Sequence, residues 1–343
     1  MSLSRPARLP LLKLPFLCIE CVIKEWDIFD IIFFALISKK TRQIVKHLKI
    51  SLNRIEISVS AWKWIELDGK LWKITGTNCQ SLFKEYPSLR KDCLVLQNNE
   101  IPVYTRRTNY GLMSYIYGSE FIALKLAMEF LNDVFKCSVE KVAIHEDNFP
   151  ESGDIGVRST VNLSIGRHFG YAQSQNLNSL LENLEVTGTC SFRLISTEKS
   201  FYCDPKLFKC KKLKFRWGSA AWITREILLQ FEVPQLMFFD CSFSVQDILS
   251  FVTYWFHSDN KKLEYLYIDF QKQISLDDFQ ASELNPSSFN GRNRVPSPKF
   301  LDHIDFSEGL EIVRHDGLQA TIHVSRETFL FYIWHDQSAI TQN

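Results

Sequence analysis

Apolar residues in the first fifty positions recur at helical spacing in three short runs. Pro15 suits the opening turn of the first helix, where its missing N–H would have no partner anyway. The second run, Ile28–Ile37, follows Asp27, a residue type that caps helix N-termini. Ser38 can cap a third helix, which carries apolar residues on one side and basic residues on the other. The pattern predicts three consecutive short helices between residues 14 and 49.

The second of these helices is apolar on nearly every side, so every side must be covered. Three helices of about 35 residues in total fall below the roughly 40 residues at which a chain can fold unaided. The cover must come from the rest of the chain or from another protein, and we expect the helix to expose more apolar surface than the chain's own contacts cover. A membrane span is excluded, because it needs about 20 apolar residues and Asp30 interrupts this run.

The next segment alternates apolar and polar residues, which is the period of a half-buried strand. Residues 55–59 show this alternation, and the sequence WKWIELDGKLWKI then predicts a hairpin that turns at Asp68-Gly69. Strand packing explains its tryptophans better than nucleic-acid stacking does. The stretch from Gln80 to Ser119 is rich in loop-forming residues, and no element is predicted in it.

A repeating pattern begins at Ser119, with a long apolar helix at residues 119–135 and a short strand at 142–144. Four Leu-x-apolar steps follow at spacings of 29, 23 and 30 residues, and they start at Leu184, Leu213, Leu236 and Leu266. These spacings bracket the usual length of leucine-rich repeats, about 20–29 residues. Capping boxes that begin at Ser244 and Ser275 predict helices after the third and fourth steps.

These steps predict parallel, adjacent strands in chain order, each followed by a helix. One strand and one helix cannot bury their apolar faces alone, so the units must stack. Another α/β arrangement is the alternative, because the spacings are irregular. Residues 285–299 are rich in Pro, Ser, Asn and Gly and predict a loop before a last hairpin, which turns at Asp316-Gly317. The predicted fold class is α/β.

Composition narrows the class of protein. A chain of 343 residues is long enough for one large domain or two ordinary ones. Its 40 basic and 39 acidic residues give a net charge of +1, so the chain as a whole is not predicted to bind nucleic acid. Nine cysteines, an odd number, indicate a reducing compartment, the cytoplasm or the nucleus, rather than a secreted domain held by disulfides.

Candidate catalytic and metal-binding residues have simpler structural explanations. Cys18 and Cys21 form a CxxC pair, but a zinc site needs two more ligands and the sequence has no second such pair. His315, His323 and His335 follow no HExxH pattern. Phosphate-binding, dinucleotide-binding and serine-nucleophile motifs are missing as well. We therefore expect no catalytic residue, no metal and no cofactor.

One basic cluster is a candidate surface for binding a target protein. In the sequence KLFKCKKLKFRW, an inward Leu213 places Lys212, Lys214 and Arg216 together on the other face of a strand, because side chains alternate. In a solenoid that face lines the concave binding surface, where cations suit an acidic or phosphorylated segment. Glu185 and Glu264 are expected at its sides. A solvated basic face without a ligand is the competing interpretation.

The N-terminal segment resembles an F-box from Leu14 to about Lys49. The residues that carry the resemblance occur in the order of that motif: Leu14-Pro15, Glu20, Asp27, Asp30, Leu36 and Ser38-Lys39-Lys40. Phe16-Leu17-Cys18 departs from it, since many F-boxes have polar or acidic residues there. Together with the segment FFDCSFSVQDILSFVTYWFHSDNKKLEYLYIDF and the last hairpin, the chain resembles nematode F-box proteins with a type-2 F-box-associated domain.

This resemblance implies an organisation: an F-box at residues 10–50, a β-hairpin and connecting region at 51–118, and an F-box-associated, leucine-rich-repeat-like α/β solenoid at 119–343. It also implies a function, the substrate-recognition subunit of a Skp–cullin–F-box ubiquitin ligase, which is not itself an enzyme. Its partners would be a Skp-type adaptor, through it a cullin, and an unidentified target protein, with neither nucleic acid nor membrane. The residues expected to bind the adaptor are Leu14, Pro15, Leu17, Ile31 and Leu36.

Two other functions are left open by the sequence. A scaffold that binds the adaptor without promoting degradation would have the same motif. A hydrolase built on an α/β fold belongs to a different class, and the missing motifs argue against it. Capture of the adaptor distinguishes the ligase subunit and the scaffold from the hydrolase. Turnover of the target then distinguishes the ligase subunit from the scaffold.

Overall fold

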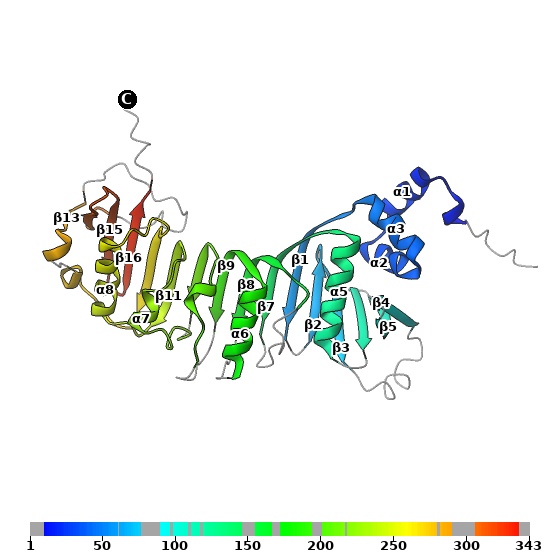
Figure 1. Ribbon diagram of the computed structural model, residues 1–343, viewed down its shortest axis with the longest axis horizontal. Helices are drawn as coiled ribbons and strands as arrows, with labels where there is room; N and C mark the ends of the chain where they lie inside the picture. The colour runs from blue at the N-terminus through cyan, green and yellow to red at the C-terminus, as the bar shows by residue number, and fades with distance from the viewer. Residues whose placement is uncertain are drawn as a thin grey trace, which may run out of the picture. The chain divides into compact units, whose positions relative to one another are not determined.

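The computed structural model describes residues 10–60, 62–76, 90–96, 99–108, 111–116, 119–145, 155–166, 172–193, 201–216, 218–279, 282–289 and 306–335. The chain forms two compact units, whose elements are labelled in Figure 1. The first unit consists of Met1–Ile57 and Trp62–Ser138, and the second consists of Ser58–Ala61 and Val139–Asn343. Both units combine helices with strands, so the predicted α/β class is confirmed.

The first unit begins with helices where the apolar pattern predicts them. A 3-10 turn, η1 (Leu11–Lys13), precedes α1 (Phe16–Lys24), α2 (Ile28–Ile37) and α3 (Lys39–Leu48). The predicted caps are present. The Asp27 carboxylate accepts a hydrogen bond from the N–H of Phe29 at 2.8 Å, and Ser38 and Thr41 form a capping box. These local hydrogen bonds fix where α2 and α3 begin.

The apolar helix α2 is covered by the first unit itself. Five of its residues are at most 7% exposed: Phe29, Ile31, Ile32, Phe34 and Ala35. The expectation that this helix exposes more apolar surface than the chain covers is therefore wrong for most of its length. Ile37, at the C-terminal end, is 66% exposed. The apolarity of a segment shows that it needs cover, but not which residues provide it.

The sheet of the first unit has the strand order β1-β2-β3-β6-β5-β4. The strands are β1 (Ser51–Val59), β2 (Lys63–Leu67), β3 (Lys70–Gly76), β4 (Arg90–Leu96), β5 (Asn99–Thr108) and β6 (Gly111–Ile116). The predicted hairpin joins β2 and β3, and its turn residues Asp68 and Gly69 have φ values of 49° and 86°. Two positive φ values are typical of the tight turn that Asp-Gly favours.

Three strands lie between Gln80 and Ser119, where no element was predicted. β4 pairs with β5 and β5 with β6 in antiparallel fashion, while β6 runs parallel to β3. The prediction of a loop-rich region is therefore wrong. The hydrogen bonds of these strands go to partners that are distant in sequence, and local composition does not reveal such pairing.

The predicted long apolar helix is confirmed as α5 (Glu120–Val134), which belongs to the first unit. It packs on α3, β2 and β3. Lys46 of α3 forms an ion pair with Asp133 at 2.6 Å, and the guanidinium of Arg42 lies 5.3 Å from the ring centre of Phe130. The chain therefore divides near Ser138, whereas the predicted divisions follow residues 50 and 118. The partners of α5 come from both predicted N-terminal segments.

The sheet of the second unit has the strand order β13-β14-β15-β16-β12-β11-β10-β9-β8-β7. Its strands are β7 (Lys136–Ile144), β8 (Ser159–Gly166), β9 (Glu185–Arg193), β10 (Lys212–Phe215), β11 (Gln235–Cys241), β12 (Tyr265–Phe270), β13 (Ser287–Ser288), β14 (Leu310–Val313), β15 (Gln319–Ser325) and β16 (Thr328–Trp334). β7 to β12 pair in parallel, and β16, β15, β14 and β13 continue the sheet antiparallel to their neighbours. The predicted parallel, sequential strands β9 to β12 are thus confirmed.

Helices of unequal length connect these strands. β8 is followed by α6 (Ala172–Asn183) and β11 by α8 (Val245–His257). Much shorter turns follow β9, β10 and β12, namely η2 (Pro205–Leu207), α7 (Arg225–Leu228) and η3 (Leu276–Phe279), and η4 (Ser282–Leu284) comes after η3. The capping box at Ser244 begins α8 as predicted, whereas the one at Ser275 begins only a 3-10 helix. Regular leucine-rich repeats stay a prediction.

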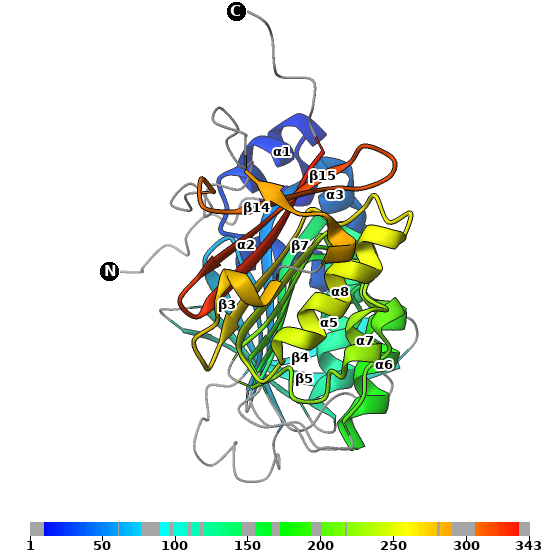
Figure 2. The ribbon, with the colours of Figure 1, turned by 90° about the vertical axis from the view of Figure 1, so that its left-hand side faces the viewer.

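The two faces of this sheet pack differently. Figure 2 shows α6, α7 and α8 along one face. On that face the rings of Phe192, Phe215 and Phe238 stack across β9, β10 and β11, with centroid distances of 4.9 and 5.1 Å. The opposite face, which we call the second face, carries a separate buried cluster over β11, β12 and β16, made of Met237, Tyr265, Phe306, Leu330, Tyr332 and Trp334.

The last predicted hairpin is present between β14 and β15, with Gly317 at a φ of 85°. Its first loop residue, Arg314, is only 2% exposed. The Arg314 guanidinium donates two hydrogen bonds to Asp316 at 2.9 and 2.8 Å and one to the carbonyl of Asn260 at 2.9 Å. These bonds hold the pKa of Asp316 well below its usual value. Of the predicted loop at 285–299, only residues 285–289 are described.

Candidate functional site

Lys212, Lys214 and Arg216 lie where alternation along β10 predicts them. Leu213 and Phe215 are buried, and Lys212 and Lys214 are half-buried. Arg216 is half-buried as well and directly follows the strand. Because Phe215 stacks with the aromatic rings on the helix-covered face, the three cations belong to the second face of the sheet.

A fourth cation, Arg193 of β9, joins two of them. The parallel pairing places Lys214 opposite Ser191, and the N–H of Arg216 donates a hydrogen bond to the carbonyl of Phe192 at 3.0 Å. Arg193 and Arg216 are therefore side by side at the next position. We call Arg193, Lys214 and Arg216 the cation cluster. Sequence reasoning missed Arg193, because only strand pairing brings it to β10.

The neighbouring charges that act on Lys214 are all positive. Burial lowers the pKa of Lys214 below its ordinary value, and the neighbouring charges of Lys212, Arg216 and Arg193 lower it further. Within the described ranges, none of the three cluster residues forms an ion pair with a carboxylate. The pKa of Lys212 is lowered as well, by burial and a neighbouring lysine, but there the carboxylate of Glu264 opposes the shift.

The two expected flanking carboxylates have different positions. Glu264 accepts a hydrogen bond from Nε2 of Gln235 at 2.5 Å, and the hydroxyl of Tyr265 donates to Oε1 of the same glutamine at 3.1 Å. Glu264 therefore lies on the Lys212 side of the second face. Glu185 instead lines a pocket at the start of β9. Neither of the two expected carboxylates therefore lies beside Arg216.

Aromatic rings border the cation cluster. The guanidinium of Arg216 lies 4.8 Å from the ring centre of Phe239, a distance at which a cation is attracted to the ring face. Its Nε is buried and has no hydrogen-bond partner among the described residues. The ring centre of Phe239 lies 5.4 Å from that of Tyr267. Both rings are partly buried against the cluster around Met237.

The residues predicted to bind an adaptor differ in exposure. Leu17 is 72% exposed. Pro15 is exposed too, and Leu14 and Leu36 are half-buried. Ile31 is only 5% exposed, so its side chain belongs to the core of the first unit and presents no surface to a partner.

Helix α1 leaves apolar side chains exposed. Ile19 and Ile23 are buried and mark the side of the helix that faces the first unit. Four other apolar residues of the helix are exposed, and we call them the α1 surface: Phe16, Leu17, Cys18 and Cys21. Exposed apolar residues that gather on one element are typical of protein-binding sites.

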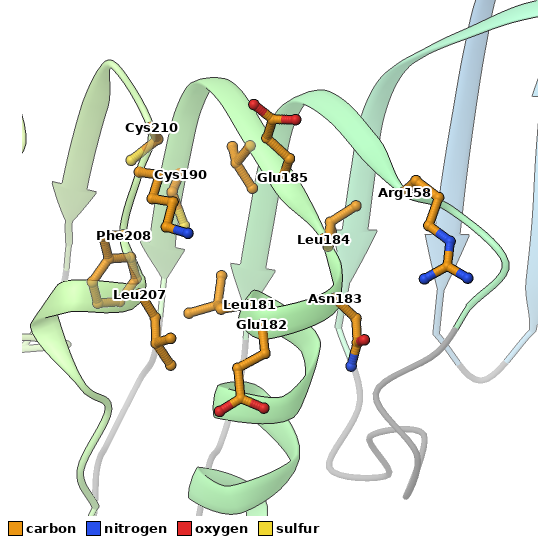
Figure 3. Close-up of a pocket in the computed structure, with 12 residues that line it drawn as sticks. Arg158, Leu181, Glu182, Asn183, Leu184, Glu185, Cys190, Leu207, Phe208 and Cys210 are labelled. Carbon is orange, nitrogen blue, oxygen red and sulfur yellow. The ribbon is translucent and has the colours of Figure 1, made fainter.

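A pocket of about 240 Å³ lies at the starts of β9 and β10, and Figure 3 shows its lining. Leu181 of α6, Leu207 of η2 and Phe208, which directly follows η2, line the pocket. Cys190 and Cys210 line it as well. Burial raises the pKa of Cys210 to about 11. A thiol that stays protonated at neutral pH is a poor nucleophile, so the pocket does not favour thiol chemistry.

Other residues considered for chemistry are dispersed. Cys18 and Cys21 are both exposed on α1. Nε2 of His335 lies 2.7 Å from the carbonyl oxygen of Leu263, and Nε2 of His315 lies 4.0 Å from Oδ1 of Asp259. Among the described residues, no group of three or more His, Cys, Asp or Glu side chains is arranged to hold a metal ion. No described helix combines the length and apolarity that crossing a membrane requires.

A segment of the second unit is similar to a known protein family. Residues 206–268 match the family described as "F-box associated". The matched segment contains β10, β11, α8 and the start of β12, and with β10 it contains Lys212, Lys214 and Arg216. Arg193 lies on β9, before the matched segment.

Two nematode proteins are similar to this chain. The uncharacterized protein F59B2.8 of Caenorhabditis elegans is 22% identical over 338 residues, which cover 91% of this chain and 73% of that protein. The uncharacterized protein F59B2.9 of the same organism is 25% identical over 170 residues, which cover 47% of this chain and 38% of that protein. No solved structure matches the chain. The nematode F-box-associated resemblance is thereby confirmed.

Proposed function

We propose that this protein is the substrate-recognition subunit of a Skp–cullin–F-box ubiquitin ligase. The observation that carries the proposal is the F-box associated domain at residues 206–268. In this account α1, α2 and α3 form an F-box that binds a Skp-type adaptor in the cytoplasm or nucleus. The second unit, whose parallel strands form a leucine-rich-repeat-like array, holds the target protein. The chain has no catalytic role, and other subunits transfer ubiquitin.

The α1 surface supports the adaptor-binding part of the proposal. It directly follows the Leu14-Pro15 pair that opens the F-box-like motif. Leu17 and Phe16 are 72% and 46% exposed. Apolar side chains that become buried at the centre of an interface typically contribute more than about 1 kcal/mol each to binding. Covering these residues with an adaptor would therefore supply a substantial part of the binding free energy.

Adaptor titration tests this proposal. The full chain is titrated with a purified nematode Skp-type adaptor, and we expect a one-to-one complex. Leu17→Asp should weaken the complex at least about tenfold, because the charged carboxylate would be buried at the interface. Ile122→Asp is the matched control, since Ile122 is 55% exposed on α5, and it should bind like the wild type. No complex, or equal binding by both variants, would reject the assignment.

Target turnover tests the ligase role separately from adaptor binding. Proteins labelled by proximity to this chain in living cells are candidate targets, and their half-lives are compared with and without it. A ligase subunit should shorten the half-life of at least one labelled protein, and Leu17→Asp should abolish that effect. If the adaptor binds and every half-life is unchanged, the protein is a scaffold.

A further inference from the structure

The cation cluster brings three positive charges to one place on the second face. Lys214 stands opposite Ser191 on the paired strand, and Arg216 is next to Arg193. Adjacent strands lie about 4.8 Å apart, and alternate residues of one strand about 6.6 Å apart. Arginine and lysine side chains are comparable in length to these spacings, so the three charged groups can converge on one anionic group.

The closeness of these three positive charges is unfavourable in itself. Burial lowers the pKa of Lys214 most, and the like charges around it disfavour its charged form further. The buried Nε of Arg216 has no acceptor among the described residues, and an unsatisfied buried donor is destabilising. An anion between the three side chains would relieve the repulsion among them.

We propose that the cation cluster binds the phosphoryl group of a phosphorylated residue in an extended segment of the target. The inference rests on the proposed function, because the segment belongs to the protein that the second unit holds. A phosphate monoester carries about −1.5 to −2 charges at pH 7 and offers three acceptor oxygens. It can therefore receive a forked pair of hydrogen bonds from a guanidinium and a further bond from the lysine. A single carboxylate carries only one charge and leaves most of the cluster uncompensated.

The rest of the second face favours a localised anion over a polyanion. Beyond Phe239 lies Asp269 of β12, whose pKa is raised by burial and by the nearby carboxylates of Glu327 and Asp240. Glu264 lies on the other side, near Lys212. A nucleic-acid backbone that crossed this face would meet these carboxylates, and like charges repel. One phosphoryl group at the cation cluster avoids them, and the adjoining rings of Phe239 and Tyr267 can take an apolar neighbour in the same peptide.

An oriented peptide array tests the proposal on the full chain without the adaptor. One set of peptides has a fixed phosphoserine, phosphothreonine or phosphotyrosine, and matched sets have the unmodified residue or glutamate at that position. We expect retention of phosphorylated peptides only. The Kd of the best phosphopeptide is then measured by fluorescence anisotropy, and the unmodified peptide should bind at least about tenfold more weakly.

Matched variants locate the binding site. Lys214→Met with Arg216→Met should raise the Kd of the phosphopeptide at least about tenfold. The control, Lys206→Met with Lys209→Met, removes the same charge from two exposed residues of the same basic run, and it should change the Kd less than about twofold. Lys214→Arg keeps the charge and should keep most of the affinity. Should the double variant fail to fold, Lys214→Met and Lys214→Arg are compared instead, with melting temperatures as the check.

Several results would overturn the inference: equal retention of glutamate or unmodified peptides, no retained phosphopeptide, binding of a single-stranded oligonucleotide in place of phosphopeptides, or an unchanged Kd in the folded site variants. Adaptor titration on the same preparations keeps the two proposals apart. If phosphopeptides bind at the cation cluster but the adaptor does not bind, the ligase assignment fails and the phosphoryl site stands. If the adaptor binds and no phosphopeptide does, the phosphoryl site fails and the adaptor-binding assignment stands.

Discussion

Helices α1 and α2 are neighbours in sequence but differ in how exposed their apolar residues are. α2 contains nine apolar residues and one aspartate, and five of its ten residues are buried in the first unit. α1 is less apolar, with Glu20 and Lys24 forming an ion pair at 2.8 Å, yet it leaves Leu17 and its exposed neighbours facing solvent. The more apolar helix is core, and the less apolar one carries the exposed surface.

The difference shows that the apolarity of a helix does not determine whether its side chains are exposed to a partner. Trp26, between the two helices, packs its ring edge-to-face on Phe34 of α2 with a centroid distance of 5.3 Å. α2 therefore helps to position the end of α1. In this account, the interior helix supports the fold, and the outer helix contacts the adaptor.

The largest expected effect comes from placing a charge in α2. Ile32 is fully buried, so Ile32→Asp puts an unpaired carboxylate into the core and should destabilise the first unit by more than about 4 kcal/mol. Urea denaturation followed by tryptophan fluorescence measures this change. Unaltered stability of Ile32→Asp would mean that α2 is not core.

A smaller loss of stability is expected at the start of α2. Asp27→Ala removes the N-cap hydrogen bond to Phe29 and should cost about 1 kcal/mol. Asp27 also forms an ion pair with Lys70, so Lys70→Met is the matched control. It breaks the ion pair and leaves the cap, and it should cost less than about 0.5 kcal/mol, because exposed ion pairs contribute little. Equal losses in the two variants would assign the stabilisation to the ion pair.

The smallest effect on stability is expected on α1. Leu17→Asp changes a solvent-exposed residue, so the free energy of unfolding should change by less than about 0.5 kcal/mol. The same urea titration measures it. A larger loss would show that Leu17 packs within the chain, and weaker adaptor binding by this variant would then reflect misfolding rather than a lost contact.

Local sequence signals predict the features that depend on few residues. Asp68-Gly69 and Asp316-Gly317 specify their hairpins through turn chemistry, and Asp27, Ser38 and Ser244 specify helix starts through capping. The leucine steps predict the order of β9 to β12, because apolar residues at that spacing must stack. The hairpins and the helix starts each follow from a segment shorter than one repeat, whereas the strand order follows from the spacing of the leucine steps.

Features that depend on distant partners were not predictable in the same way. β4, β5 and β6 pair across sequence separations that composition does not reveal, and α5 joins the first unit through contacts with α3 and two strands. For the same reason the sequence identifies the cations of β10 but not Arg193, which strand pairing adds. The burial of Ile31, expected to contact a partner, also depends on the whole first unit.

Amide hydrogen exchange with and without a purified Skp-type adaptor tests the central claim most directly. The adaptor should slow exchange at the amides of α1, Phe16–Lys24, because covering the α1 surface suppresses opening of that helix. Amides of α2 should exchange slowly in both samples and change little, because the chain itself covers this helix. An adaptor that binds without slowing exchange in α1, or that protects a different part of the chain, would contradict the account.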